Sequence, residues 1–298
     1  MHDIIIIGAG TAGLSAAIYA LRAGKTVLLL EASAYGGQII NTPEIENYPA
    51  IKNISGFEFA SDLFKQAKDL GAEIKYQKVI SINSTGTKVT TSKDEYECKA
   101  VIIATGTTTR KLGLPHEDEW LGAGISYCAT CDGAFYKGKD VAVNGGGSTA
   151  LEDALFLSNY CSKVYVVHRR DEFRGENALV EQLKEKDNVE LCLNSTIKAL
   201  KGEKSLEGIE VENKIDGTVK TIPVSGLFVA IGRQSNNVEF KDLINLDQGG
   251  YVVAGEDCRT NIDGIFTAGD CRTKAVRQLV TAASDGAVAA LAACQYIK

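Results

Sequence analysis

The residues best suited to chemistry are two cysteines spaced Cys-x-x-Cys, Cys128 and Cys131, and the acid that follows them directly, Asp132. They are the only close pair among eight cysteines. A tetrahedral zinc site of four cysteines would need a second close pair, so we expect no metal. In a reducing compartment such a pair is more often redox-active than structural. We therefore interpret Cys128 and Cys131 as a disulfide that opens and closes, with a structural thiol pair as the alternative.

A dinucleotide-binding signature lies near the start of the chain, around the glycine-rich segment Gly8–Gly13. Ile4–Ile7 before it is a short β-branched run, typical of a buried parallel strand. Leu14–Leu21 after it has a helical pattern, and Thr26–Leu30 is a second strand that ends at Glu31. A lone glycine motif is a weak signal, but strand, glycines, helix, strand and acid in this order indicate a Rossmann site. A glycine-rich turn in an unrelated α/β fold is the alternative.

Each part of this first signature has a physical task in binding a dinucleotide. Gly8 permits the tight turn, Gly10 lets the backbone approach a pyrophosphate, and Gly13 lets the helix pack closely on the strand. The helix N-terminus attracts the phosphates. The acid at the end of the second strand can accept hydrogen bonds from both ribose hydroxyls and would repel a 2′-phosphate. The contacts predicted here are Gly8, Gly10, Thr11, Ala12, Gly13 and Glu31.

A second signature repeats the first at an offset of 137 residues. The offset carries the three glycines onto Gly145, Gly147 and Ala150, the last being a small residue that the third position allows. Asp140–Val143 is the expected strand before these residues, and Ser148–Leu157 is the expected helix after them. The repeat indicates a duplicated nucleotide-binding unit.

The two signatures differ where a dinucleotide presents its ribose, at the end of the second strand. The repeat replaces the acid with a basic run, His168, Arg169 and Arg170, with Arg174 one helical turn further on. Guanidinium groups without a carboxylate are what a ribose 2′-phosphate requires. We therefore predict that the second site favours NADP(H) over NAD(H), and that the two sites hold different nucleotides. A solvated charged face is the alternative.

The same series of elements follows each glycine-rich segment, which predicts two similar domains. Short extended pieces typical of an antiparallel β-meander are expected at about 74–98 and 188–223, and each set precedes a buried strand that ends in small residues. We predict an α/β protein with two Rossmann-like three-layer dinucleotide-binding domains, each with a small antiparallel meander. The predicted domains are 1–110, an inserted domain 111–240 that carries the cysteine pair, and 241–298, which completes the first.

Composition and charge disfavour two classes of partner, nucleic acid and anionic membranes. Apolar residues make up 45% and charged residues 23% of the 298 residues, as in ordinary globular proteins. The net charge of −6 disfavours nucleic acid and anionic membranes as partners. Met1–Asp3 leads straight into Ile4–Ile7 without a charged leader and a long apolar stretch. We therefore expect no signal peptide, no membrane span and a cytoplasmic location.

Together these segments resemble the low-molecular-weight thioredoxin reductases, over essentially the whole chain and in the same order. The most specific match is Cys128–Asp132 inside the second domain, joined to the basic run at His168. Asn144 departs from the pattern, because it stands where an apolar strand residue is expected. The other matching segments are Gly8–Gly13, Gly36–Gln38, Ala104–Gly106, Gly145–Ala150, and Gly264–Asp270 followed by Arg277 and Gln278.

The resemblance implies FAD in the first site, NADPH in the second, thioredoxin as the disulfide substrate, and a homodimer. For the first site it adds the cofactor contacts Gly36, Gly37, Gln38, Asn47, Ala104, Thr105, Gly106, Gly269, Asp270, Arg277 and Gln278. For the second site it implies Gly145, Gly147, Ser148, Thr149, Ala150, His168, Arg169, Arg170, Arg174, Ile231, Gly232 and Arg233.

The implied reaction passes electrons from NADPH via FAD to the Cys128–Cys131 disulfide and on to oxidised thioredoxin. The departing thiolate needs a proton, and Asp132 is the nearest candidate general acid if burial raises its pKa. One alternative is a flavoprotein reductase or oxidase for another dithiol partner, peroxiredoxin-linked or a small-molecule dithiol. The other is a non-catalytic FAD- and NADP(H)-binding redox sensor, which has no need of an acid beside a Cys-x-x-Cys.

Overall fold

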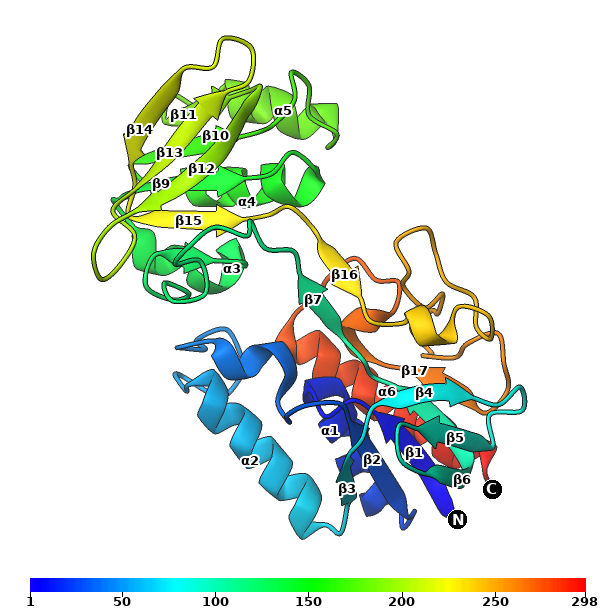
Figure 1. Cartoon of the computed structure of the whole chain (residues 1–298). Helices are drawn as coiled ribbons and strands as arrows, with labels where there is room; N and C mark the ends of the chain where they lie inside the picture. The colour runs from blue at the N-terminus through cyan, green and yellow to red at the C-terminus, as the bar shows by residue number, and fades with distance from the viewer. The chain divides into compact units, whose positions relative to one another are not determined.

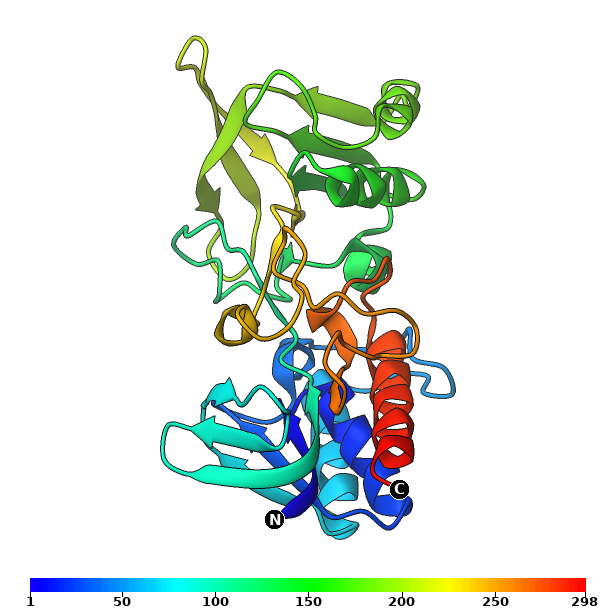
Figure 2. The same cartoon turned by 90° about the vertical axis from the view of Figure 1, so that its right-hand side faces the viewer.

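A computed structural model describes the whole chain, residues 1–298, as two compact units (Figure 1). Unit 1 comprises residues 1–108 and 234–298, and unit 2 comprises residues 109–233. Unit 1 is therefore discontinuous in sequence, and unit 2 is inserted into it. Both ends of the chain lie in unit 1 (Figure 2).

Two short strands carry the chain across the boundary between the units. They are β7 (Thr107–Thr109) and β16 (Arg233–Ser235), and they pair with each other. The boundary expected after residue 240 falls inside unit 1, because Asn237 is bonded to the backbone of that unit. Its Nδ2 lies 2.9 Å from the carbonyl oxygens of both Gly250 and Cys271.

Unit 1 is built on one seven-stranded sheet. Its parallel strands follow the order β3-β2-β1-β6-β17, and β5 and β4 continue the sheet as an antiparallel extension of the first half of β6. The predicted meander thus belongs to the main sheet. The strands are β1 (His2–Ile7), β2 (Val27–Glu31), β3 (Glu73–Tyr76), β4 (Val79–Ile82), β5 (Lys88–Thr91), β6 (Glu95–Ile103) and β17 (Ile265–Thr267).

The apolar run of β1 is continuous because both faces of the sheet are covered. Successive strand residues point to opposite faces, so Ile4 and Ile6 enter one core and Ile5 and Ile7 the other. Helices cover the first face, and the meander with residues 238–252 covers the second. The helices of unit 1 are α1 (Thr11–Arg22), α2 (Gly56–Asp69) and α6 (Leu279–Tyr296), with 3₁₀ turns η1 (Gly37–Asn41), η3 (Val238–Phe240) and η4 (Gly269–Cys271).

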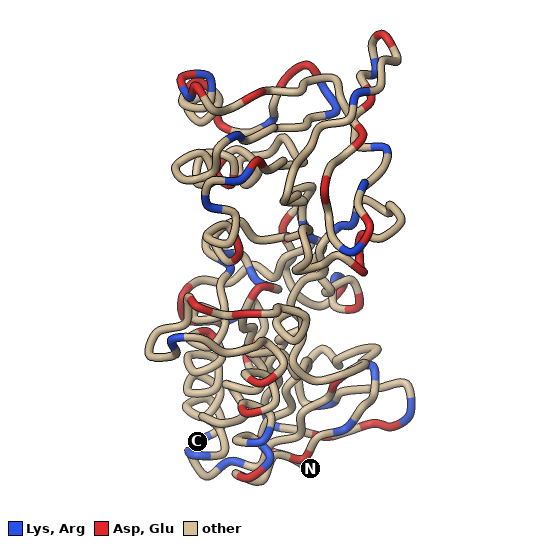
Figure 3. Tube along the Cα trace, turned by 90° about the vertical axis from the view of Figure 1, so that its left-hand side faces the viewer, with Lys and Arg blue, Asp and Glu red and all other residues tan.

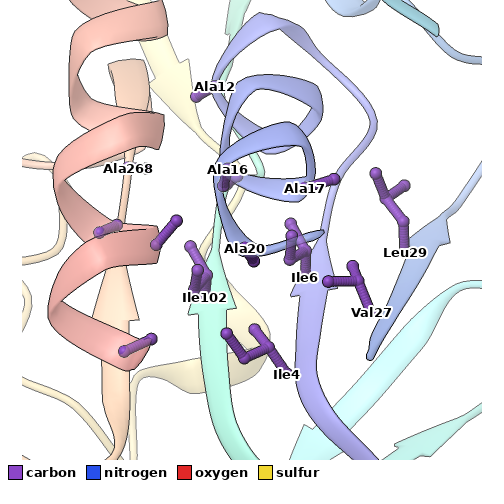
Figure 4. Packing of buried hydrophobic residues seen from close by; sticks show 14 of the residues in the cluster. Ile4, Ile6, Ala12, Ala16, Ala17, Ala20, Val27, Leu29, Ile102 and Ala268 are labelled. Atoms are coloured by element: carbon purple, nitrogen blue, oxygen red, sulfur yellow. The ribbon is translucent and has the colours of Figure 1, made fainter. Parts of the chain in front are cut away.

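Small residues let α1 and α6 pack closely against each other and against the sheet (Figure 4). A Cβ atom at Gly286 of α6 would lie 2.3 Å from the Ala12 carbonyl oxygen of α1. Ala16 and Ala20 of α1 are fully buried in the same core, beside Ile102 of β6. The close contact fixes α1, and with it the glycine segment at its N-terminus.

Unit 2 has a five-stranded parallel sheet in the order β11-β10-β9-β15-β8. Helices cover one face and a separate three-stranded antiparallel meander covers the other, which makes three layers. The strands are β8 (Ile125–Ser126), β9 (Asp140–Asn144), β10 (Lys163–Val167), β11 (Val189–Cys192), β12 (Ser195–Lys201), β13 (Gly208–Asn213), β14 (Val219–Pro223) and β15 (Gly226–Val229). The helices are α3 (Ala129–Asp132), α4 (Ser148–Ser158) and α5 (Asn177–Lys184), with a 3₁₀ turn η2 (Gly133–Tyr136).

The two sheets share one strand register. Ile4 of β1 pairs with Val27 of β2, and Val141 of β9 pairs with Val164 of β10, which are the same positions at the offset of 137. The internal repeat of the sequence is thus also a repeat of the structure, and the predicted α/β fold class is confirmed.

Charges of both signs are interspersed along the trace of each unit (Figure 3). None of the helices combines the length and the apolar character that crossing a membrane requires.

Candidate redox and nucleotide sites

The predicted redox pair forms a disulfide in unit 2. Cys128 and Cys131 are joined, with their Cα atoms 5.3 Å apart. Cys128 is the N-cap of the short helix α3, and its carbonyl oxygen accepts hydrogen bonds from the backbone N–H groups of Cys131 (3.2 Å) and Asp132 (3.1 Å). The helical turn brings the acid back beside the cysteine pair.

The Asp132 carboxyl is partly buried and hydrogen-bonded. Burial raises its pKa above the usual range of an aspartate, and the Ser126 hydroxyl, which donates to Oδ2 at 2.6 Å, opposes that rise. A raised pKa is what a general acid at neutral pH requires. Ser126 was not predicted from the sequence. Its position six residues before the acid, in the strand β8, gave no motif to recognise.

A second buried carboxylate anchors the residue before the disulfide. Glu117 is 3% exposed and accepts hydrogen bonds from Leu112 N, Gly113 N and the Tyr127 hydroxyl, each at 2.8 Å. Burial and this carboxylate raise the pKa of Tyr127. The loop before β8 is thereby tied to the redox segment, and this contact too was missed at the level of the sequence.

In unit 1 the first glycine segment turns as predicted between β1 and α1. Gly8 has a φ of +108°, and a Cβ there would lie 2.3 Å from the Ala104 carbonyl oxygen. A Cβ at Gly13 would lie 1.9 Å from the Gly8 carbonyl oxygen. Gly10 differs, because the nearest atom to a Cβ there is the Gly37 Cα at 3.9 Å. Gly8 and Gly13 are thus required by packing, whereas a Cβ at Gly10 would make only an ordinary van der Waals contact.

Glu31 lies against the same glycine segment. Its carboxylate accepts hydrogen bonds from Ala9 N (2.8 Å) and Ser33 N (2.9 Å), which places it against the glycine segment. Gly36 forms an isolated bridge with Gly10, and Gln38 lies in η1 just beyond. The structure therefore brings the predicted residues of the first site to one edge of the sheet.

The C-terminal segment of unit 1 returns to the same edge. A Cβ at Gly269 would lie 2.7 Å from the Ala12 Cβ. The Arg277 guanidinium stacks over the Tyr251 ring at 4.3 Å and donates to the Asp270 carbonyl oxygen at 3.3 Å. Two further predicted cofactor contacts are hydrogen-bonded within unit 1. Asn47 lies 3.4 Å from Gln278, and Thr105, which precedes Gly106, lies 2.7 Å from Asn237.

A buried ion cluster supports that return. Asp285 of α6 accepts hydrogen bonds from the Arg272 guanidinium (2.8 and 2.9 Å), from Lys274 Nζ (2.8 Å) and from Gly269 N (3.0 Å). The two cations lower the pKa of Asp285 against the effect of burial. Because these residues are scattered in sequence, no pattern indicated the cluster.

The second glycine segment reproduces the first. A Cβ at Gly145 would lie 2.3 Å from the Ala230 carbonyl oxygen, whereas a Cβ at Gly147 would meet no atom within 4 Å. Ser148, Thr149 and Ala150 form the first turn of α4. Ile231, Gly232 and Arg233 follow β15 at the same edge of the sheet, and the Gly232 carbonyl oxygen accepts a hydrogen bond from Arg110 N at 3.0 Å.

The basic run divides into one buried and three exposed side chains. His168 is 4% exposed, stacks on Phe173, and places Nε2 3.1 Å from the Glu172 carbonyl oxygen. Burial, with the neighbouring arginines, lowers its pKa, so the imidazole is neutral at pH 7. Arg169, Arg170 and Arg174 are exposed. The backbone N–H of Arg174 donates to the Gly146 carbonyl oxygen at 2.7 Å, which holds the arginine loop against the glycine segment.

Comparison with known proteins places the chain in a family. Residues 2–286 match the pyridine nucleotide-disulphide oxidoreductases. A thioredoxin reductase of Listeria monocytogenes is 40% identical over 100% of this chain and 94% of its own. A bifunctional thioredoxin reductase/thioredoxin of Mycobacterium leprae is 41% identical, and the chain spans 66% of its length. The crystal structure of a thioredoxin reductase from Streptococcus pyogenes superimposes with a TM-score of 0.95 at 39% identity, covering 99% of this chain and 98% of that one.

The chain belongs to the pyridine nucleotide-disulphide oxidoreductase family. The family and the thioredoxin reductase relatives imply FAD and NADPH as cofactors. Both glycine segments suit a dinucleotide. The N-cap residues of α1 and α4 are Gly10 and Gly147, and neither helix has a side-chain cap. Backbone N–H groups at both helix N-termini therefore face space that a pyrophosphate can fill.

Proposed function

We propose that this oxidoreductase is a thioredoxin-disulfide reductase, which passes electrons from NADPH via FAD to the Cys128–Cys131 disulfide and on to oxidised thioredoxin. The observation that carries the proposal is the disulfide next to a partly buried carboxyl of raised pKa, Asp132. A redox sensor has no use for a proton donor at that place. The names of the Listeria and Streptococcus relatives support thioredoxin as the partner.

FAD, when bound, accepts a hydride from NADPH and supplies the electron pair that opens the disulfide. As the bond breaks, Asp132 protonates the departing thiolate. One thiolate of the resulting dithiol then attacks the thioredoxin disulfide, and the second resolves the mixed disulfide. The electron pair leaves with reduced thioredoxin, and the Cys128–Cys131 bond forms again.

The proposed cofactor contacts follow the two glycine segments. In unit 1, FAD takes the edge of the sheet between Gly10, Glu31 and the return at Asp270. In unit 2, NADPH takes the N-terminus of α4, and Arg169, Arg170 and Arg174 bind its 2′-phosphate. The ring of His168 is buried, so His168 anchors the start of the arginine loop in unit 2.

A homodimer and a cytoplasmic location are part of the proposal. Large apolar side chains on α6 are exposed and recur at helical spacing, Val280 at 39%, Val288 at 36% and Leu291 at 53%, which suits burial against a second copy. A reducing compartment suits an enzyme that holds six free cysteines. Light scattering of the purified protein tests the dimer.

The test of the proposed function separates its two half-reactions. Hydride transfer from NADPH needs neither cysteine, so Cys128→Ser and Cys131→Ser should keep FAD and still bleach with NADPH in the absence of oxygen. Each should lose turnover with thioredoxin, because one sulfur must attack and the other must leave. Asp132→Asn should bleach normally and pass electrons to the disulfide about 10²–10⁴ times more slowly, the usual contribution of a positioned acid.

Stopped-flow flavin absorbance measures both steps on the same samples. Reduction of thioredoxin by either serine variant at the wild-type rate would refute the role of the disulfide. Turnover of the wild type with peroxiredoxin or a small dithiol, and none with thioredoxin, would assign the enzyme to another partner.

A further inference from the structure

The Ser126 hydroxyl links the Asp132 carboxyl to the backbone of Cys128. It donates to Asp132 Oδ2 at 2.6 Å, it accepts from Cys128 N at 3.0 Å, and it lies 3.3 Å from the Cys128 carbonyl oxygen. Ser126 is 2% exposed, and β8 pairs it with Phe228 of β15. The sheet thus fixes one hydroxyl between the proton donor and the cysteine.

This hydroxyl has a hydrogen-bond arrangement for each protonation state of the acid. A hydroxyl carries one hydrogen and two lone pairs. Toward an ionised Asp132 the hydrogen points at Oδ2, a charge-assisted bond of the short kind. Toward a protonated Asp132 the Oγ accepts the carboxyl hydrogen, and its own hydrogen turns to the Cys128 carbonyl oxygen. In both states the Ser126 hydroxyl and Asp132 Oδ2 stay hydrogen-bonded to each other.

We propose that Ser126 is a positioning residue whose rotating hydroxyl keeps Asp132 hydrogen-bonded both before and after the acid gives up its proton. The inference rests on the proposed role of Asp132. Without the hydroxyl, a partly buried carboxylate would lose a hydrogen-bond donor just as it becomes charged, which is costly. The acid would then release its proton less readily.

Asp132 is ionised between the opening of the disulfide and its re-formation. Two electrons break the Sγ–Sγ bond, and the two sulfurs take up two protons: one from Asp132 and one that corresponds to the hydrogen of the NADPH hydride once its electron pair has passed to the disulfide. The Asp132 carboxylate accepts the Ser126 hydrogen bond during this interval. When thioredoxin takes the electron pair, the dithiol releases two protons, and one of them returns to Asp132.

The groups around Asp132 do not provide the same support. Tyr136 on η2 faces the acid, and burial together with the Asp132 charge raises the Tyr136 pKa. Helix α4, which packs on α3, carries Asp153, whose pKa burial and Glu152 raise to about 7 and Arg233 lowers. The Ser126 hydrogen bond opposes the effect of burial on Asp132, because it lowers the Asp132 pKa. Removal of the hydroxyl must therefore raise it further.

The test compares Ser126→Ala with wild-type holoenzyme across pH. After one equivalent of NADPH is added without oxygen, the rate of flavin reoxidation by the disulfide is measured at each pH. This rate falls as Asp132 ionises, so the midpoint of the fall should move toward alkaline pH in the alanine variant. A hydrogen bond to a charged group corresponds to a displacement of about one to two pH units. Infrared absorption of the protonated carboxyl, assigned with Asp132→Asn, should titrate with the same displacement.

Two further variants separate the hydroxyl from its surroundings. Ser126→Thr keeps the hydroxyl and should keep the wild-type midpoint. This variant tests the inference even if Ser126→Ala fails to fold. Tyr127→Phe removes the neighbouring hydroxyl, which bonds to Glu117, and should leave the midpoint unchanged. An unmoved midpoint and carboxyl band in Ser126→Ala, or a displaced midpoint in Ser126→Thr, would overturn the inference. A wild type that never reduces thioredoxin would instead refute the proposed function.

Discussion

We propose that single residues after β10 decide the choice of nucleotide. His168 points into unit 2, where a Cβ at Gly146 would lie 2.1 Å from its ring, so the buried ring requires a glycine at 146. The arginines that follow are exposed, and the structure gives Arg169, Arg170 and Arg174 no carboxylate partner in an ion pair. Their guanidinium groups are thus available to a 2′-phosphate.

We predict that NADPH is preferred over NADH and that this preference depends on the arginines. Two guanidinium contacts of roughly 1.5–3 kcal/mol each amount to about 10²–10⁴ in kcat/KM. The double variant Arg169→Ala/Arg170→Ala should lose most of this preference through weaker NADPH binding, with NADH nearly unaffected. Steady-state kinetics with both nucleotides measure the effect.

Lys184→Ala is the matched control for charge. It removes an exposed cation of α5 in the same unit, paired with Glu181 at 2.8 Å, and should leave both nucleotides unchanged. Equal use of NADPH and NADH by the wild type would contradict the assignment of the arginines.

Single residues were predictable where their type and spacing carry the chemistry. The cysteine pair, Asp132 and the glycines are of this kind. Ser126, Glu117 and Asp285 were not predictable, because each acts through contacts that only the folded chain creates. For His168 the sequence predicted its position in the basic run, but it did not predict that the ring is buried.

At the scale of elements, α1 and α4 each begin at a glycine segment with two different kinds of glycine. One kind is filled on its Cβ side by backbone, as at Gly13. The other kind leaves room for a Cβ, which would make an ordinary contact with the Gly37 Cα at Gly10 and meet no atom within 4 Å at Gly147. The sequence motif predicts this division, with Gly13 needed for packing and Gly10 for the approach of a pyrophosphate.

We predict opposite outcomes for two substitutions in the same segment. Gly13→Ala should destabilise unit 1 by at least about 2 kcal/mol, because the new methyl group meets the Gly8 carbonyl oxygen at 1.9 Å. Gly10→Ala should fold with near wild-type stability but purify with little FAD, because the methyl group fills the space that the pyrophosphate needs. Urea unfolding and the ratio of flavin to protein measure the two effects.

Gly147→Ala is the control in unit 2. It should keep FAD and the fold and weaken NADPH binding at least about tenfold, by the same argument. A Gly10→Ala protein with full FAD content would show that the pyrophosphate does not bind at Gly10, at the N-terminus of α1.

At the scale of the whole molecule, the chain passes out of unit 1 and back into it. Unit 2 is one continuous segment with its own sheet, two cores and the disulfide. Unit 1 needs both residues 1–108 and 234–298, because β17 pairs with β6 and α6 packs on α1. The resemblance to the reductase family implied this insertion, whereas the residues at which the chain crosses depend on hydrogen bonds such as those of Asn237.

We predict that the fragment 109–233 folds alone, binds NADPH and lacks flavin. The only tryptophan of the chain, Trp120, is 2% exposed in this unit, so its fluorescence reports folding of the fragment directly. Cooperative urea unfolding with NADPH binding near that of the full chain is the expected result. A fragment 1–108 alone should remain unfolded, and a folded one would contradict the need for the C-terminal return.

Burial of the other cysteines has a consequence for the chemical selectivity of the molecule. Cys98, Cys161, Cys192, Cys258 and Cys271 are buried and Cys294 is partly buried. Burial raises the pKa of Cys98 and Cys258 to about 12 and that of Cys161 to about 11. At pH 7 a thiol with a pKa of about 12 is ionised in only about one molecule in 10⁵, and only the thiolate attacks a disulfide. These three thiols are therefore poor nucleophiles at neutral pH and compete little with Cys128 and Cys131 for disulfide exchange.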